Sequence, residues 1–169
     1  MNNFIIVAPP RCRTTWLSLF LTTENSLCYH DMSMYYEYEE MVSMMKSGSM
    51  EYMGNSDSGI LFYIDKLLND IKPKIVVIER DLNEVEDSLR KCFTDEMVNK
   101  IQSIIQIAMG KEIERIRNTY EHLAIKFEEI NMENARKIWE YCLPTILFSE
   151  ERFKIFNRAR VEPCWIGGR

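Results

Sequence analysis

The sequence predicts a three-layer α/β domain, in which helices flank a mainly parallel central sheet of about four to five strands. Two strongly apolar runs, FIIVA at 4–8 and KIVVIE at 74–79, suit strands that are buried on both faces of such a sheet. Each run is followed by a segment whose apolar residues recur at helical spacing, and strands that alternate with helices are typical of a parallel sheet. The length of 169 residues suits one domain, spanning residues 1–169.

The other elements follow in order from local patterns. Apolar residues at helical spacing predict helices over 14–23, 32–46, 60–71, 82–92, 98–116 and 132–142. Two further strands are predicted at 26–31 and 122–130. Segment 47–59, SGSMEYMGNSDSG, is rich in Gly, Ser and Asn and is expected to be a loop around a short extended piece, while 145–169 shows no clear period.

Composition and charge exclude several classes of protein. A net charge of −5 does not suit a protein that coats nucleic acid, because such proteins carry a basic face, although a local basic pocket for a small anion remains compatible. The five cysteines lack CxxC spacing, so no zinc site or disulfide framework is predicted and reduced thiols in the cytosol are expected. The chain shows no signal peptide and no apolar run of ~20 residues, so we expect a soluble cytoplasmic protein without a membrane partner.

The loop APPRCRTT, which starts at Ala8 after the first strand, has the spacing and position of a phosphate-binding loop. A helix that starts there offers free backbone N–H groups to an anion at the carboxyl edge of the sheet. The usual GxxxxGK[ST] pattern is not met, because Ala8 and Arg13 stand at its glycine positions and Thr14 at its lysine position, which weakens an ordinary NTPase interpretation. Arg11 can bind an oxyanion with two parallel hydrogen bonds, and Thr14 and Thr15 add donors. The alternative is a turn with solvated arginines.

A second candidate anion site follows the strand at 74–79. Arg80 stands directly at the strand's end, and Ser88 lies eight residues later in the next helix. A strand-end arginine and a helix hydroxyl can converge on an anion beside the first loop. The alternative is an arginine paired with Glu84 and a serine that faces solvent. Taken with Arg11, the pair indicates one ligand that carries anionic groups at both ends.

These two stretches resemble the sulfotransferase family, enzymes that use 3′-phosphoadenosine 5′-phosphosulfate. The family's phosphosulfate loop has the form P-[KR]-[ST]-G-T-T-W-L, and PRCRTTWL fills it from Pro10 to Leu17. Its 3′-phosphate motif is a strand that ends in Arg with Ser eight residues later, as at Arg80 and Ser88. AIKFEEI at 124–130 resembles the family's strand and acidic corner before a helix. The resemblance implies a P-loop-type fold over most of the chain.

The resemblance also implies which residues bind the cofactor. The loop would hold the 5′-phosphosulfate through Arg11, Thr14 and Thr15, Trp16 would lie near the adenine, and the strand-end arginine with its helix serine would bind the 3′-phosphate. The full cofactor-binding set is Arg11, Cys12, Arg13, Thr14, Thr15, Trp16, Arg80 and Ser88.

Two positions of the loop depart from the family pattern. Cys12 replaces the usual Ser or Thr and removes a hydroxyl donor. Arg13 replaces Gly, so its side chain must point away from a bound anion or toward its sulfonate. At the other end of the chain, the Arg-Lys-Gly segment of larger relatives has no clear counterpart, and WIGGR at 165–169 resembles it only faintly.

Sulfonyl transfer needs an acceptor hydroxyl or amine, a base for its proton, and cations over the sulfonate and the leaving phosphate. The charge demands resemble those of phosphoryl transfer, so positioning and electrostatic stabilisation should dominate. Arg11 and Arg13 could supply the positive charge. No metal is required, and the sequence offers no metal cluster. GNSDSG at 54–59 could line an acceptor site or be only a loop.

His30 and Asp31 are the candidate bases, because they stand at the end of the second predicted strand and hence at the same edge of the sheet. Histidine is suited to this role, since an unperturbed imidazole titrates near neutral pH. Asp57 and Glu37 rank behind them. The other histidine, His122, opens a late strand and is expected to be structural.

We therefore expect a small sulfotransferase-like enzyme, which transfers a sulfonate group to a hydroxyl or amine of a small acceptor and releases adenosine 3′,5′-bisphosphate. One alternative is a P-loop kinase that acts on a nucleotide or a small molecule. Another is a non-catalytic nucleotide-binding or interaction module on the same fold. Binding of adenosine 3′,5′-bisphosphate without magnesium favours the first, and magnesium-dependent binding of ATP favours the second.

Overall fold

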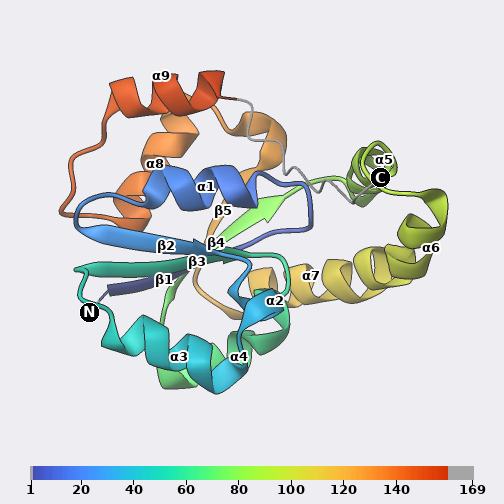
Figure 1. Cartoon of the computed structure of the whole chain (residues 1–169), viewed down its shortest axis with the longest axis horizontal. Helices are drawn as coiled ribbons and strands as arrows, with labels where there is room; N and C mark the ends of the chain where they lie inside the picture. The colour runs from blue at the N-terminus through green and yellow to red at the C-terminus, as the bar shows by residue number, and fades with distance from the viewer. Residues whose placement is uncertain (1, 160–169) are drawn as a thin grey trace.

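The computed structural model describes residues 2–159, so the WIGGR segment and Cys164 lie outside the described residues. All strands of the described chain belong to one parallel sheet with the order β2-β3-β1-β4-β5. They are β1 (Asn2–Val7), β2 (Ser26–His30), β3 (Tyr52–Asp57), β4 (Lys74–Glu79) and β5 (Leu123–Lys126). Helices flank the sheet on both faces (Figure 1), which confirms the predicted α/β class.

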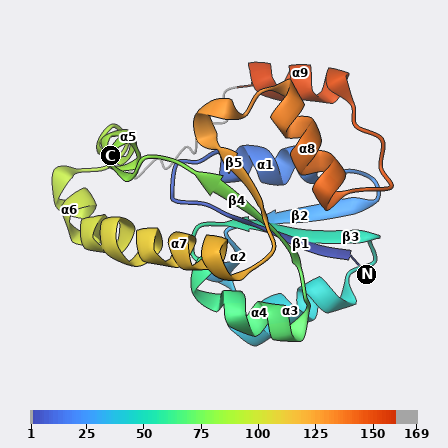
Figure 2. The same ribbon diagram turned by 180° about the vertical axis from the view of Figure 1, so that it is seen from behind.

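The helices cover the sheet in two layers. They are α1 (Thr14–Leu21), α2 (Met32–Tyr35), α3 (Tyr38–Ser47), α4 (Ile64–Asp70), α5 (Leu82–Arg90), α6 (Asp95–Ser103), α7 (Gly110–Thr119), α8 (Met132–Cys142) and α9 (Glu150–Arg158). α1, α8 and α9 lie on one face, and α3 and α4 lie on the other (Figures 1 and 2). α5 and α6 form an arm on the side toward which β4 points (Figure 1). Within residues 2–159, no helix has both the length and the apolar character needed to cross a membrane.

β1 occupies the centre of the sheet and forms the core with its neighbours. It pairs with β3 on one side and with β4 on the other. The side chains from Phe4 to Val7 and those of Val76 to Ile78 are fully buried. Fully burying a Val, Ile or Phe side chain contributes roughly 1.5–3 kcal/mol, so these apolar runs explain why the two strands pair at the centre.

Segment 47–59 differs most from its sequence expectation, because it contributes a central strand rather than a loop around a short extended piece. All six residues of β3 are buried, although the last four are Gly, Asn, Ser and Asp. Gly54 leaves room for the neighbouring ring of Phe4, since a Cβ at this position would lie 2.2 Å from a ring carbon. Strand propensity is low for these residue types, and only the partners on both sides make the strand stable.

Two long predicted helices are interrupted in the structure. Segment 32–46 divides into α2 and α3 because Glu37 starts a new helix, in which its backbone N–H donates to the Glu40 carboxylate in a reciprocal capping box. Segment 98–116 contains a π-helical stretch at Ile104–Met109 between α6 and α7. Helical periodicity alone does not locate such breaks.

In the described part of the tail, up to residue 159, the structure contains a helix that the sequence pattern did not reveal. α9 begins after Ser149, whose side chain accepts a hydrogen bond from the N–H of Arg152. The helix buries Phe153, whose ring packs at a steep angle against the rings of Trp16 and Phe20. An aromatic cluster therefore holds α9 against α1, on the side of α1 that faces away from the sheet (Figure 1).

Candidate functional site

A cavity of about 900 Å³ opens at the carboxyl edge of the sheet, next to the ends of β1, β2, β3 and β4. Its lining brings together residues from both predicted anion sites and both candidate bases: Arg11, Arg80, Ser88, His30 and Asp31. In open parallel sheets, ligands bind outside the carboxyl ends of the strands. The cavity is therefore the candidate functional site.

The loop between β1 and α1 has an unusual backbone. Arg11 and Arg13 have φ angles of 65° and 60°, in the left-handed region that residues other than glycine rarely adopt. α1 begins at Thr14 without a capping side chain, so the N–H groups of its first turn are left for another acceptor. Left-handed residues followed by an uncapped helix N-terminus form a geometry that suits an anion.

Arg11 joins the two predicted anion sites. Its Nε donates a hydrogen bond of 3.3 Å to Ser88 Oγ, and its carbonyl oxygen accepts one of 2.7 Å from Arg80 Nη1. Among the residues that the structure describes, no carboxylate forms a salt bridge with Arg11 or Arg13. The loop thus carries positive charge that the described protein does not neutralise.

Arg80 lies in the wall of the cavity with its positive charge only weakly compensated. Its side chain is 14% exposed, and its guanidinium lies 4.0 Å from the centroid of the Phe127 ring. Its Nε is 3.6 Å from a carboxylate oxygen of Glu84 and, within residues 2–159, has no hydrogen-bond partner. The contact with Glu84 that the alternative interpretation predicts is present, but it is longer than a hydrogen bond.

The remaining loop residues take different positions. Cys12 is fully buried, and burial raises the pKa of its thiol to about 12, so the side chain packs in the core. Trp16 is 4% exposed, stacks on Phe20 and donates from Nε1 to a backbone carbonyl of α9, which leaves little of its ring for a ligand. Arg13 is exposed, with its guanidinium 5.6 Å from the centroid of the Phe127 ring. Arg13 lines the cavity, whereas Cys12 does not.

His30, the last residue of β2, lies beside the first turn of α1. Its Nε2 is 3.1 Å from Thr14 Oγ1, 3.0 Å from Thr15 Oγ1 and 3.3 Å from Asp31 Oδ2. In the neutral tautomer with the proton on Nδ1, Nε2 accepts from the hydroxyls, and in the protonated ring it donates to the carboxylate. Both threonines of the loop therefore contact the candidate base.

Asp31 has an environment that favours its neutral form. Burial raises the pKa of its carboxyl above the ordinary value of 3.8, the positive charge of His30 opposes this effect, and the charge of Asp57 adds to it. Asp31 also has a φ of 53°, in the left-handed region. A half-buried acid in a rare backbone conformation beside a histidine is typical of a functional position.

The polar end of β3 holds the turn that carries Asp31, and sequence reasoning missed this role. The N–H groups of residues 31–33 donate in order to the Ser56 carbonyl, Asn55 Oδ1 and Asp57 Oδ2, over 3.2, 3.5 and 2.7 Å. Asn55 and Asp57 are 0% and 1% exposed. The run of Asn, Ser and Asp at 55–57 is the only trace of this role in the sequence. These residue types favour loops, so the run by itself does not indicate the end of a strand.

The lower-ranked candidate bases are occupied elsewhere. Asp57 lines the cavity, but its carboxylate also accepts from Ser33 Oγ at 2.8 Å and from the N–H of Gly59 at 2.7 Å. Glu37 caps α3 and is absent from the cavity lining. His122 lies before β5, at the opposite edge of the sheet, and its Nδ1 is 2.8 Å from a backbone carbonyl oxygen. Within residues 2–159, no three His, Cys, Asp or Glu residues gather in a way that could hold a metal ion.

Comparison with known proteins adds a likeness at the level of fold. No protein-family model matches the chain, and no curated protein matches its sequence. Among solved structures, the chain is similar to a crystal structure of a sulfotransferase from Alicyclobacillus acidocaldarius, with a TM-score of 0.58. The match covers 92% of this chain and 89% of that chain at 13% sequence identity. The fold is sulfotransferase-like.

In this sulfotransferase-like fold, the segments that carry the predicted motifs end at the edge of the sheet where the cavity opens. β1, the loop at Arg11 and α1 form the strand–loop–helix unit that opens the chain. The motif-bearing segments around Arg80 and His30 reach the same edge because their strands run parallel to β1 or to its neighbour β3.

Proposed function

We propose that this chain is a sulfotransferase-like enzyme, which transfers a sulfonate from 3′-phosphoadenosine 5′-phosphosulfate to a hydroxyl or amine of a small acceptor. The observation that carries the proposal is the double hydrogen bonding of Arg11, to Ser88 through its side chain and to Arg80 through its carbonyl. A ligand with an anionic group at each end would meet both clusters in one cavity.

The described residues fit such a nucleotide. The uncapped start of α1 and the unneutralised charges of Arg11 and Arg13 suit the 5′ anionic group. Arg80, whose Nε has no hydrogen-bond partner in the described part of the chain, and Ser88 suit the 3′-phosphate. When bound, the donor would supply an electrophilic sulfonate attached to a phosphate that can leave.

The chain's own groups would handle the proton and the charge. His30 would take the proton from the acceptor hydroxyl or amine, and the Asp31 carboxylate, 3.3 Å from Nε2, would stabilise the protonated ring. The hydroxyls of Thr14 and Thr15 would keep the ring oriented. Arg11 would stabilise the negative charge that develops on the leaving group, the kind of electrostatic contribution that usually dominates such transfers.

Thermal denaturation with adenosine 3′,5′-bisphosphate in the absence of magnesium tests the binding step. At a ligand concentration of 100 times Kd, binding to the folded state alone adds about 2.7 kcal/mol of stability, so we expect a clear rise in the melting temperature. The rise should shrink strongly in Ser88→Ala, which keeps both arginines, and vanish in Arg80→Ala. Arg136→Ala is the matched control, because Arg136 pairs with Glu150 at the surface of α8, outside the cavity.

Two results would contradict the proposal. Stabilisation by ATP that requires magnesium, with no response to adenosine 3′,5′-bisphosphate, would indicate a kinase. Binding that is the same in the wild type, Ser88→Ala and Arg80→Ala would indicate a nucleotide-binding module that uses another surface. Transfer itself is then tested by mass spectrometry, as an added SO₃ mass on an acceptor.

A further inference from the structure

Asp57 is a buried carboxylate in the wall of the cavity, at the carboxyl end of β3. The residue is 1% exposed, and no Lys, Arg or His among residues 2–159 forms a salt bridge with it. Taking a charge out of water is costly unless the charge is paired or hydrogen-bonded. The place of Asp57 in the wall must therefore be explained by its hydrogen bonds.

Four hydrogen-bond donors surround the Asp57 carboxylate. Oδ1 accepts from Ser33 Oγ at 2.8 Å and from the N–H of Gly59 at 2.7 Å. Oδ2 accepts from the N–H of Ser33 at 2.7 Å and from Asn55 Nδ2 at 3.2 Å. An asparagine would turn its own NH₂ group toward one of these pairs of donors, so only a carboxylate can accept from all four.

The hydrogen bonds that Asp57 accepts hold the turn that carries Asp31. Asp57 binds both the backbone and the side chain of Ser33, which lies two residues after Asp31, and the N–H of Met32 donates to Asn55 Oδ1. Asp31 needs such support, because its φ of 53° lies in the left-handed region that residues other than glycine rarely adopt. The end of β3 therefore fixes the conformation of the turn.

The turn places the Asp31 carboxylate beside His30. Asp31 Oδ2 lies 3.3 Å from His30 Nε2, and the same nitrogen is 3.1 Å from Thr14 Oγ1 and 3.0 Å from Thr15 Oγ1. Burial raises the pKa of the Asp31 carboxyl most, and the charge of Asp57 raises it further, so the two carboxyl groups are close enough to interact. A chain of polar contacts thus runs from the end of β3 to the imidazole ring and the first turn of α1.

We propose that Asp57 is a positioning residue for the candidate base, which fixes the Asp31 carboxylate at His30 through Ser33 and the turn. Its own oxygen atoms are filled by the four donors and take no part in the transfer. This inference rests on the proposed function for its catalytic meaning. The orientation of the His30 ring is a property of the protein without ligand and does not depend on that function.

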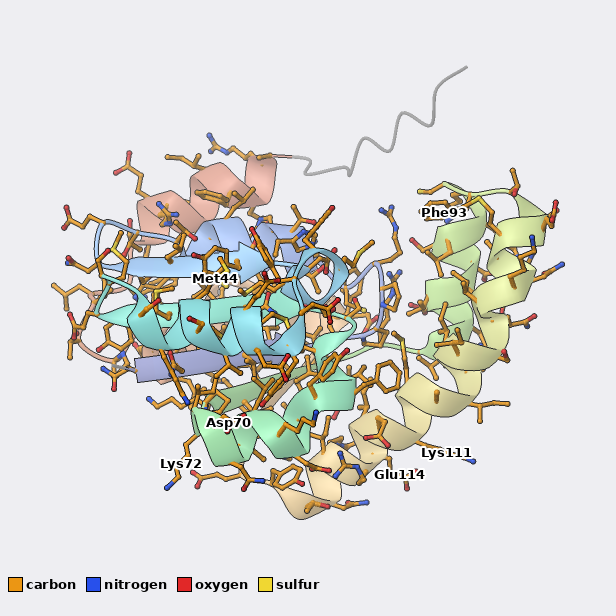
Figure 3. All side chains as sticks on the ribbon, turned by 60° about the horizontal axis from the view of Figure 1, so that its bottom comes forward. Met44, Asp70, Lys72, Phe93, Lys111 and Glu114 are labelled. Carbon is orange, nitrogen blue, oxygen red and sulfur yellow. The ribbon has the colours of Figure 1, made fainter. Side chains whose placement is uncertain are left out.

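The ring signals of the histidines test the placement of the base in the protein without ligand. His30 and His122 are the only histidines of the chain, so His122→Gln assigns their ring carbon–proton signals in an NMR spectrum. Asp57→Asn should shift the His30 signal and leave that of His122 in place. Asp70→Asn is the matched control and should shift neither signal, because Asp70 accepts from the Tyr38 hydroxyl on α4, outside the cavity lining (Figure 3).

Ser33→Ala is a milder variant that keeps the carboxylate. It removes the bond from Ser33 Oγ and leaves the other three donors of Asp57 in place. The His30 signal should therefore shift in the same direction as in Asp57→Asn, but by less. If urea denaturation shows that Asp57→Asn does not fold, Ser33→Ala alone decides, and an unshifted His30 signal in this variant overturns the inference.

A comparison of rate with binding separates positioning from a general loss of structure. The rate is that of sulfonate transfer from 3′-phosphoadenosine 5′-phosphosulfate to water, measured as release of adenosine 3′,5′-bisphosphate. Asp57→Asn should lower this rate by about 10²-fold, because a small misplacement of a catalytic group can cost that much. Binding of adenosine 3′,5′-bisphosphate should change little, since none of the bonds that Asp57 accepts comes from Arg11, Arg80 or Ser88.

The outcomes separate this inference from the proposed function. If the His30 signal of Asp57→Asn coincides with that of the wild type, the inference is overturned, whether or not the nucleotide binds. If the signal shifts as expected but the wild type binds no adenosine 3′,5′-bisphosphate, the proposed function fails, and Asp57 still positions His30. If Asp57→Asn weakens binding of the nucleotide by as much as it lowers the rate, Asp57 supports the whole cavity rather than the base, and the inference is wrong.

Discussion

Arg80 Nη1 donates a hydrogen bond of 2.7 Å to the carbonyl oxygen of Arg11, across 69 residues of sequence. The bond connects the end of β4 to the loop after β1, and it reaches that loop at a residue with a φ of 65°. Arg80 therefore helps to hold the loop in its left-handed conformation in addition to any contact with a ligand.

The first prediction follows from this bond. Arg80→Ala should lower the free energy of unfolding by roughly 1.5–3 kcal/mol without any ligand, because a hydrogen bond from a charged donor is lost. Urea denaturation measures the change. Arg136→Ala, which breaks an exposed ion pair with Glu150, should cost less than about 1 kcal/mol. Equal losses in the two variants would mean that Arg80 does not hold the loop.

Two substitutions of Arg13 distinguish the effect of backbone strain from the effect of charge. A residue with a side chain in the left-handed region costs about 1–2 kcal/mol, which glycine avoids, although glycine also loses more entropy on folding. Arg13→Gly should therefore leave the free energy of unfolding unchanged or raise it by up to ~1 kcal/mol, whereas Arg13→Ala keeps the strain and should be less stable than Arg13→Gly. Both variants should bind the anionic nucleotide more weakly, as measured by calorimetry. A Gly variant less stable than the Ala variant would rule out strain at this position.

His30 is tested through the rate of transfer. If the proposed function holds, His30→Gln should lower the single-turnover rate by about 10²–10⁴, because glutamine can bond to the threonine hydroxyls but cannot take a proton. Binding of the nucleotide should change little. His122→Gln is the control, since His122 lies at the opposite edge of the sheet. A rate for His30→Gln equal to that of the control would remove His30 from the mechanism.

The raised pKa of Asp31 predicts how the free energy of unfolding depends on pH. Burial raises the pKa of its carboxyl above 3.8, so the folded protein binds this proton more tightly than the unfolded chain does. The resulting stability is present below pH 3.8 and is lost as the pH rises through the pKa of the folded state. Asparagine cannot ionise, so the Asp31→Asn variant does not lose this stability. Its free energy of unfolding should therefore exceed that of the wild type at pH 7, and the difference should shrink toward low pH.

Unfolding curves at several pH values measure that margin. Asp87→Asn, which removes an exposed carboxylate from α5, is the matched control, and its free energy of unfolding at pH 7 should stay within about 0.5 kcal/mol of the wild type. If Asp31→Asn were less stable than the wild type at pH 7, the ionised carboxylate would be a net stabilising group, contrary to the prediction.

Gly54 tests the placement of β3. Gly54→Ala should destabilise the protein by about 1–3 kcal/mol, because the new Cβ would lie 2.2 Å from the ring of Phe4 in the neighbouring strand. The double variant Gly54→Ala with Phe4→Leu should recover part of this loss relative to the sum of the single changes. Additive effects in denaturation experiments would show that the two residues do not touch.

Local patterns in the sequence determined the α/β class and the positions of the two arginine-bearing strand ends. Apolar runs such as 74–79 report burial directly, and parallel strands place their carboxyl ends at one edge, so Arg11, His30 and Arg80 could be assigned to the same region. β3 could not be assigned with them, because its polar residues are stabilised by contacts with α2 and β1 that no local pattern contains.

Tertiary structure alone decided how the site is connected. The Arg11–Ser88 contact spans 77 residues, and the turn at Asp31 is held by the side chains of a strand more than twenty residues later. Sequence periodicity reports which residues prefer to leave water, whereas packing determines which of them meet, because contact energies depend on neighbours that are distant in the chain.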